Sequence, residues 1–139
     1  MKINLKQYVL KQPDKLLSAV LYLVALHSFL TGLALVVQPA WSMELVGFSP
    51  ICERFFPTQG GVFHIVMAVA YIMGAVNAKK CHYVIVFAII VKSAATLFLL
   101  AYCFTVEFKW IILLFGIGDG LMGVMIFLSF QYYLHFSSI

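Results

Sequence analysis

Charged residues are scarce in this chain, and their scarcity excludes most soluble folds. Only 10% of the 139 residues are Asp, Glu, Lys or Arg, while 64% are hydrophobic. A typical soluble domain carries about 25% charged residues. A soluble fold of this size could not hide so much apolar surface, whereas a lipid bilayer accommodates it. The composition therefore indicates an integral membrane protein, with the lipid bilayer as its first partner.

Closely spaced cysteines and basic patches are both missing. Cys52, Cys81 and Cys103 lie far apart and form no CxxC pair, so a cysteine zinc site and thioredoxin-type dithiol chemistry have no support. The net charge of +4 comes from basic residues that gather at the ends of apolar segments and do not interleave with aromatic residues. Nucleic acid is therefore not an expected partner.

Four apolar segments are long enough to cross a hydrocarbon core of about 30 Å as helices. They cover residues 16–37, 60–76, 83–104 and 110–130. None has the period-two alternation of a membrane-spanning strand. The sequence thus predicts an all-α fold in which residues 1–139 form one four-transmembrane-helix bundle.

The connectors between these segments differ in length. Residues 77–82 and 105–109 are short, so the helices that they join should be antiparallel neighbours. The first connector, 38–59, is long, and its residues 40–46 can form a short interfacial helix that Gly47 would end. We expect this connector to be either a lid over one end of the bundle or only an interfacial anchor. The lid candidates are Trp41, Phe48, Glu53 and Arg54.

Basic residues indicate how the chain is oriented in the membrane. Six of them precede the first segment or lie between the second and the third, and two flank the opposite side. The six are Lys2, Lys6, Lys11, Lys15, Lys79 and Lys80, and the two are Arg54 and Lys109. Cytoplasmic loops carry the excess of Lys and Arg. The bias predicts a multi-pass protein of the cell inner (plasma) membrane with both termini in the cytoplasm.

One face of each predicted helix collects small and polar residues at helical spacing. These faces should point into the bundle, because polar groups are costly in lipid. They consist of His27, Thr31, Ala34 and Gln38 with Ser28 beside them; Gly61, His64, Ala68, Tyr71 and Ala75; Ala88, Lys92, Thr96 and Cys103; and Gly116, Asp119, Gly120 and Gly123. The spacing of Gly116 and Gly120 favours close helix packing.

Lys92 and Asp119 are the most informative members of these faces. Each lies nine residues into its predicted helix, so both fall near the bilayer midplane. A lone charge at that depth costs on the order of 2.5–3.5 kcal/mol, and pairing removes much of the cost. The sequence predicts a buried Lys92–Asp119 ion pair. The pair either fixes the register of two helices or lines a cavity that binds a molecule or moves a proton.

Two histidines are further candidates for a ligand cavity. His27 lies near the depth of the ion pair, while His64 lies about four residues, or about 6 Å, farther outward. That offset disfavours a haem held by both rings, and it equally disfavours a metal site. We therefore predict no cofactor and no metal. The alternative is that both are hydrogen-bonded interior histidines. The cavity candidates are His27, His64, Tyr71, Lys92 and Asp119, with His64 lining a cavity beneath the first connector.

The layout of the chain resembles the small DoxX-like family of membrane proteins and its uncharacterised relatives. The shared features are the size, the four spans, the long first connector and the short later turns. The resemblance covers most of the chain but matches no catalytic motif of the family. It implies a small membrane subunit, in some members linked to quinone-dependent oxidoreductases.

Three hypotheses for function follow. The first is non-enzymatic: an accessory subunit or binding module for a membrane-soluble molecule such as a lipid or a quinone, in a larger membrane complex or a homo-oligomer. The second is a proton-coupled transporter or channel built by oligomerisation, suggested by ionisable residues within the membrane. The third is a membrane-embedded isomerase or oxidoreductase in which His64 and Asp119 act as acid and base.

Overall fold

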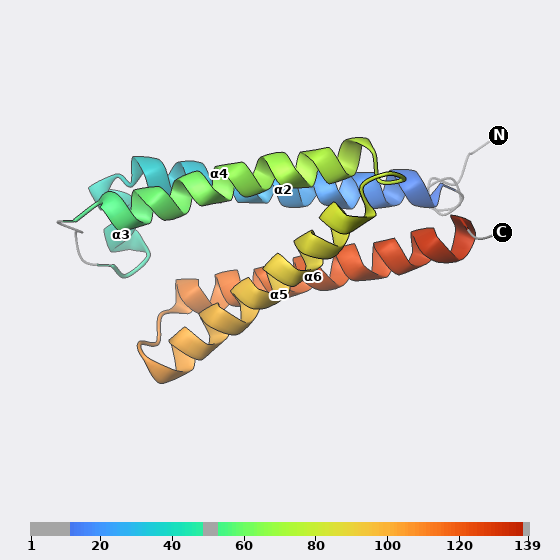
Figure 1. Ribbon diagram of the computed structural model, residues 1–139. Coiled ribbons are helices and arrows are strands. Elements are labelled where there is room, and N and C mark those ends of the chain that lie inside the picture. Colours follow the sequence, from blue (N-terminus) through green and yellow to red (C-terminus); the bar gives the residue numbers. More distant parts are fainter. Residues whose placement is uncertain (1–11, 49–52, 138–139) are drawn as a thin grey trace, which may run out of the picture.

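The computed structural model describes residues 12–48 and 53–137, and this part of the chain contains helices and no strand. The helices are α2 (Pro13–Val37), α3 (Ala40–Leu45), α4 (Phe55–Val76), α5 (His82–Thr105) and α6 (Trp110–Ser137) (Figure 1). All except the six-residue α3 are long and apolar enough to cross a membrane. The prediction of an all-α fold with four spanning helices is confirmed.

The long helices run past the predicted spans at most of their ends. α2 begins at Pro13, three residues before the predicted start, because proline suits the first helical position and Asp14 is favourable in the first turn. α4 begins at Phe55, whose backbone N–H donates to the Glu53 carboxylate over 3.0 Å. α6 continues to Ser137, seven residues beyond the predicted end at 130. Apolar runs mark the lipid-facing stretch, whereas the helices continue into the polar interface.

The first connector holds the predicted short helix. After α2, Gln38 adopts a left-handed conformation with φ of 40°, and Pro39 precedes α3. Gly47 follows α3 with φ of 83°, a region that glycine reaches without strain, so it ends the helix as expected. Residues 49–52 of this connector lie outside the described part of the chain.

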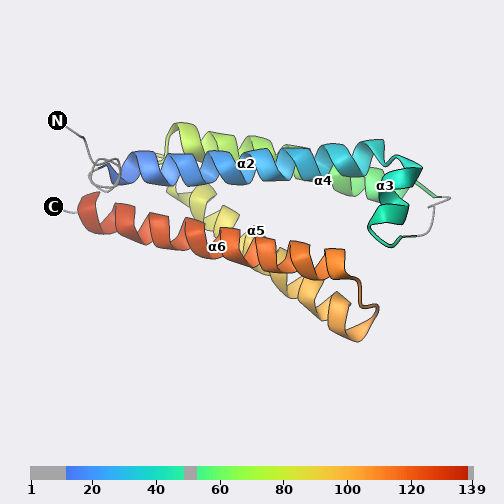
Figure 2. The same ribbon diagram turned by 180° about the vertical axis from the view of Figure 1, so that it is seen from behind.

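The four long helices form two antiparallel pairs that diverge along their length (Figures 1 and 2). α2 packs along α4, and α5 packs along α6, while contacts between the pairs are fewer, and α4 contacts α5 less than α2 contacts α6. The pairs meet at the end that holds the α4–α5 turn, which we call the closed end. They separate at the end that holds α3 and the α5–α6 loop, which we call the open end. Consecutive α4 and α5 are thus antiparallel but not closely packed.

Close packing is concentrated in the half of the molecule next to the closed end. Its buried apolar side chains come from all four long helices and include Leu17, Leu21, Ile85, Ile126 and Phe130. The outward faces are also apolar, with many large side chains exposed, as expected for helices that meet lipid. The molecule therefore has a tightly filled closed half and a less filled open half.

Small residues set the closest contacts within each pair. In the first pair, a Cβ atom at Gly32 would lie only 2.6 Å from the carbonyl oxygen of Gly61. In the second pair, Gly116, Gly120 and Gly123 of α6 face side chains of α5. The small-xxx-small spacing of α6 therefore serves helix packing, as the sequence suggested.

The predicted inward face of α2 was wrong by about one residue. The buried positions of the helix are Leu17, Val20, Leu21, Val24, Ala25, Ser28 and Gly32. Of the predicted face, His27 and Thr31 are half-buried, Ala34 is exposed, and only Gln38, which follows the helix, is buried. The Gly32–Gly61 contact turns this face of α2 toward α4. The prediction had given weight to polar residues, and in this helix the closest contact is made by a glycine.

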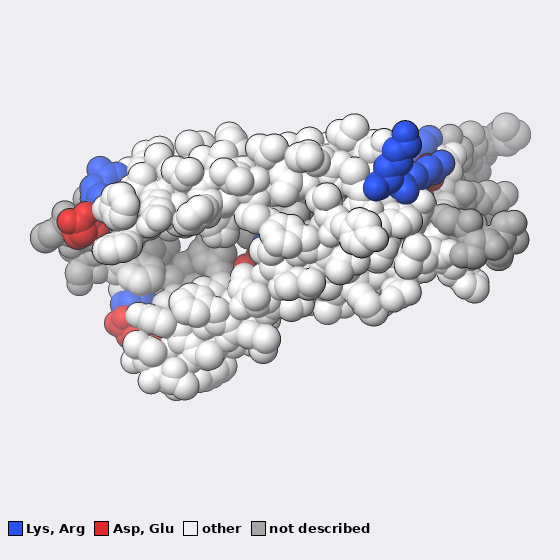
Figure 3. All heavy atoms as spheres, viewed as in Figure 1, with Lys and Arg blue, Asp and Glu red and all other residues white. Residues whose placement is uncertain are grey.

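Apart from the buried Lys92, the described Lys and Arg residues lie at the two ends of the molecule (Figure 3). Lys15, Lys79 and Lys80 belong to the closed end, where α2 begins and α6 ends, and Lys79 lies 3.9 Å from Asp14. Arg54 and Lys109 belong to the open end. Lys2, Lys6 and Lys11 lie outside the described residues. The start of α2 and the end of α6 therefore lie at the same end of the molecule, as a chain that crosses a membrane four times requires.

Candidate functional site

An ion pair joins the second pair of helices in the middle of the molecule. The Lys92 ammonium of α5 donates to the Asp119 carboxylate of α6, and the two side chains are 3% and 6% exposed. Gly123 allows this approach, because a Cβ atom there would lie 3.3 Å from the Cβ atom of Lys92. The sequence had predicted this pairing, and the structure shows it. Each charge has the partner that a buried ion requires.

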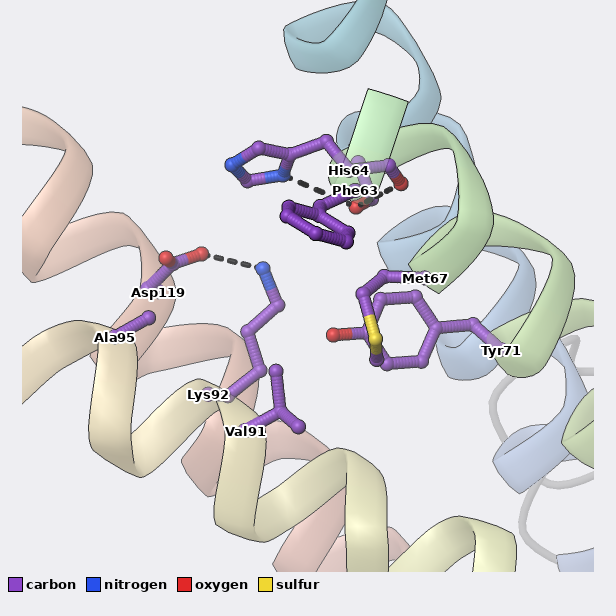
Figure 4. Close-up of a pocket in the computed structure, with 9 residues that line it drawn as sticks. Phe63, His64, Met67, Tyr71, Val91, Lys92, Ala95 and Asp119 are labelled. Carbon is purple, nitrogen blue, oxygen red and sulfur yellow. Dashed lines mark hydrogen bonds and ion pairs between the residues drawn. The ribbon is translucent and has the colours of Figure 1, made fainter. Parts of the chain in front are cut away.

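The ion pair borders a cavity of about 190 Å³ between the two helix pairs. Its lining consists of Ser28 from α2; Phe63, His64, Met67 and Tyr71 from α4; Val91, Lys92 and Ala95 from α5; and Asp119 from α6 (Figure 4). Most of the lining thus comes from α4 and α5, the two neighbours that pack least. In Figure 3 a hollow is visible between these helices, and Asp or Glu atoms, drawn in red, can be seen inside it.

The walls of the cavity are largely apolar. Phe63, Met67 and Tyr71 follow one another at four-residue intervals, so they lie along one face of α4. Val91 and Ala95 have the same spacing on α5 and form the facing wall (Figure 4). Phe63 is 61% exposed, which places it at the lipid-facing rim. The cavity therefore opens sideways between α4 and α5.

His64 is held in place by Ser28. The Ser28 hydroxyl donates to the His64 carbonyl oxygen over 3.0 Å, and its oxygen lies 3.3 Å from His64 Nδ1. Because the hydroxyl has one proton and gives it to the carbonyl, the second contact is satisfied when Nδ1–H donates to the hydroxyl oxygen. In the neutral imidazole this assignment leaves His64 Nε2 as an acceptor. In Figure 4 Nε2 is the ring nitrogen that lies away from Ser28.

The other polar groups converge on the same space. The Lys92 ammonium lies 5.9 Å from the centre of the Tyr71 ring, within the range of a cation–π contact. Among the described residues, the ammonium makes one hydrogen bond, to Asp119, although it has three N–H groups. Two donors on a buried cation are thus available at the cavity wall. The site can hold an oxygen atom by donating to it.

Four of the five cavity candidates named from the sequence line this space: His64, Tyr71, Lys92 and Asp119. His27 does not. Its ring packs edge-on against Phe115 of α6 with 6.2 Å between ring centres, and its buried Nδ1 has no hydrogen-bond partner among the described residues. The rotation of α2 explains this position, since Ser28 and Gly32 face α4 and His27 is turned toward α6.

None of the four lid candidates lines the cavity. Trp41 is 69% exposed, and the Glu53 carboxylate accepts from the first N–H of α4. Arg54 donates to the carbonyl oxygens of Val36 and Val37 over 3.3 and 2.7 Å, so it caps the end of α2. The expectation that these residues cover His64 is not met by the described part of the connector.

Phe48 has a different role, in a contact that ties the two helix pairs together at the open end. Lys109, from the α5–α6 loop, donates to the carbonyl oxygen of Gly47 over 2.7 Å. Its ammonium also lies 4.9 Å from the Phe48 ring centre and 2.9 Å from the Glu107 carboxylate. The first connector is therefore fastened to the second pair of helices, which limits how far the pairs separate.

Several cavity residues were not foreseen. Phe63, Met67, Val91 and Ala95 resemble the lipid-facing residues around them in type, so no sequence signal singles them out. Ser28 had been placed beside the polar face of α2, and its contact with His64 depends on the rotation of that helix. Their positions come from the divergence of the two pairs.

The donor types present do not suggest a metal centre, since no group of three His, Cys, Asp or Glu side chains converges within residues 12–48 and 53–137. The arrangement instead combines an apolar pocket with a few oriented polar groups, as small-molecule sites do. Comparisons of the chain with protein-family models, curated proteins and solved structures found no match. The site's own geometry is therefore the basis for its function.

Proposed function

We propose that this protein is a small binding module of the membrane that holds the polar head of a membrane-soluble molecule, a lipid or a quinone, in the cavity between α4 and α5. The observation that carries the proposal is a cavity of about 190 Å³ whose walls are apolar and whose floor is the Lys92–Asp119 pair. A ligand with an apolar tail could enter from the side, past Phe63, without leaving the bilayer.

The packing around the cavity supports binding rather than transport. Between the cavity and the closed end, the described interior is filled by Leu17, Leu21, Val24, Ile85 and Ile126. A proton or ion pathway across the membrane needs polar groups or water at every depth. Apolar side chains make up most of this layer, which favours a site with a lateral opening over a pathway.

An acid–base enzyme receives less support from the same geometry. His64 and Asp119 both line the cavity, but Asp119 is bonded to Lys92. A carboxylate that accepts a hydrogen bond from an ammonium is already engaged, so it is less available to approach a proton of a bound molecule. The ion pair is better suited to orienting a bound group than to taking a proton from it.

A paired substitution on α5 tests the proposal. Ala95 lines the cavity, whereas its neighbour Ala94 is exposed and lies outside the lining. Ala95→Phe should fill the space, and Ala94→Phe adds the same side chain on the lipid side. Native mass spectrometry of the gently purified protein should detect a bound membrane-soluble molecule in the wild type and in Ala94→Phe, and a loss of at least fivefold in Ala95→Phe. Equal occupancy in all three proteins would show that the cavity is not the binding site.

A further inference from the structure

The cavity lining contains one charged residue of each sign. Lys92 and Asp119 are bonded to each other, and the other lining residues are Ser, Phe, His, Met, Tyr, Val and Ala. His64 as the neutral imidazole, with Nδ1–H donating to Ser28 and Nε2 left to accept, adds no charge to the lining. With His64 neutral, the formal charge of the lining is zero.

This balance discriminates among head groups. An anionic head group would leave one negative charge without a partner near the middle of the spans, where uncompensated charge is costly. It could accept from the remaining N–H groups of Lys92, but the single ammonium would then face two negative charges, so one of them would stay uncompensated. A neutral head group leaves the ion pair intact.

The available hydrogen-bonding groups define what a neutral head must carry. The Lys92 ammonium has N–H groups left after its bond to Asp119, so it can donate to a carbonyl or hydroxyl oxygen. His64 Nε2 can accept from a hydroxyl, because Nδ1 is engaged with Ser28. A single oxygen-bearing group can therefore satisfy the buried ammonium without any change in charge.

The volume limits the size of that head. A dry cavity of about 150 Å³ is enough to hold benzene. The cavity here, about 190 Å³, has room for one ring or a group of that size, but not for a lipid with its chains. The tail must therefore leave through the lateral opening beside Phe63 and lie in the bilayer against α4 and α5.

We infer that the ligand is an electrically neutral amphiphile whose compact head bears a carbonyl or hydroxyl oxygen, and that the cavity disfavours anionic head groups. This inference rests on the proposed binding function and adds the chemical class of the ligand. A quinone and a neutral lipid alcohol share this chemistry, and the test below separates them.

Three photoreactive probes that share the same alkyl tail and differ only in the head group test the inference on the full chain in lipid nanodiscs. They carry a diazirine next to the head, and their heads are a hydroxyl, a benzoquinone ring and a phosphate. We expect at least one neutral probe to label the peptides that contain Phe63, Met67 or Val91 at least fivefold more than the phosphate probe does. Of the two neutral probes, the one that labels these peptides more shows whether the ligand is a lipid alcohol or a quinone.

A charge variant gives a second measurement. Asp119→Asn leaves Lys92 without its carboxylate, so the phosphate probe should gain at least fivefold in cavity labelling relative to the hydroxyl probe. Glu107→Gln removes a carboxylate at the open end, outside the cavity, and should leave this ratio unchanged. The wild-type ratio needs no substitution, so it decides the question even if Asp119→Asn fails to fold.

The outcomes separate this inference from the proposed function. If the phosphate probe labels the cavity walls to within fivefold of the better neutral probe, the neutral-head inference is overturned while binding stands. If no probe labels these walls, or if Ala95→Phe leaves the labelling unchanged, the binding function itself is overturned.

Discussion

Gly32 of α2 and Gly61 of α4 lie where the backbones of the two helices come closest. A Cβ atom at either position would be 2.6 Å from the carbonyl oxygen of the other glycine. Both neighbouring atoms belong to the backbone, so neither can move aside cheaply. This contact sets the rotation of α2, and with it the positions of Ser28 inside the cavity site and His27 outside it.

We predict that Gly32→Ala or Gly61→Ala forces the first helix pair apart. The added methyl group overlaps backbone, and overpacking of this kind costs about 1–3 kcal/mol in free energy of unfolding. Gly60 and Gly118 are matched controls, because a Cβ atom there would meet no atom within 4 Å. Their alanine variants should be unchanged or up to about 1 kcal/mol more stable, since alanine favours the helix.

Thermal or denaturant unfolding in a fixed detergent measures all four variants. A loss of stability in the control variants as large as in Gly32→Ala would mean that glycine matters here for some reason other than the α2–α4 contact. The binding assay with Ala95→Phe and Ala94→Phe can be repeated on Gly61→Ala, which should also lose ligand because Ser28 and His64 move apart.

We predict that Lys92 and Asp119 contribute to stability as a pair. Either Lys92→Leu or Asp119→Leu leaves one charge unpaired within the spans, at a cost on the order of 2.5–3.5 kcal/mol. The double variant removes both charges, so it should be less destabilised than the sum of the single variants. A stability measurement on the four proteins of this cycle gives the coupling energy.

Ser93→Leu is the control for the ion-pair cycle. Ser93 is next to Lys92 on α5, is exposed, and donates to the Ile89 carbonyl oxygen of its own helix. Its replacement should change stability by less than about 0.5 kcal/mol. Additive losses in the Lys92 and Asp119 variants would contradict the pairing seen in the structure.

The sequence was sufficient for the fold class because four long apolar segments leave the chain few alternatives in a bilayer. It was also sufficient for the ion pair, since Lys92 and Asp119 lie at matching depths in adjacent antiparallel helices. These inferences rest on length, hydropathy and depth, which are properties of each segment. They need no knowledge of how the helices are rotated about their axes.

The shape of the site could not be inferred in the same way. Whether His27 or Ser28 faces the interior depends on a rotation of about 100°, and the Gly32–Gly61 contact that fixes it joins residues far apart in the chain. The apolar walls, such as Met67 and Val91, resemble lipid-facing residues in type. The splaying of the two pairs is a property of their packing as a whole.

We predict that Lys109 holds the open end together. Lys109→Met removes its hydrogen bond to the Gly47 carbonyl and its contact with the Phe48 ring. A charge-assisted bond at a partly exposed position is worth about 1 kcal/mol, so local opening should increase roughly fivefold. Hydrogen exchange of the α3 amides measures this opening. Lys80→Met, at the closed end, should leave exchange in α3 unchanged, and an equal effect of both variants would exclude a specific tie.

The last prediction concerns orientation, because the positive-inside rule places the closed end in the cytoplasm. Lys80 at that end and Glu44 in α3 are both exposed, so each can carry a reporter cysteine once Cys52, Cys81 and Cys103 are replaced by alanine. Glu44 is preferable to Arg54, whose side chain caps α2. A membrane-impermeant maleimide should label Glu44→Cys in intact cells and Lys80→Cys only after permeabilisation. Labelling of Lys80→Cys alone in intact cells would place both ends of the chain outside, against the bias of its basic residues.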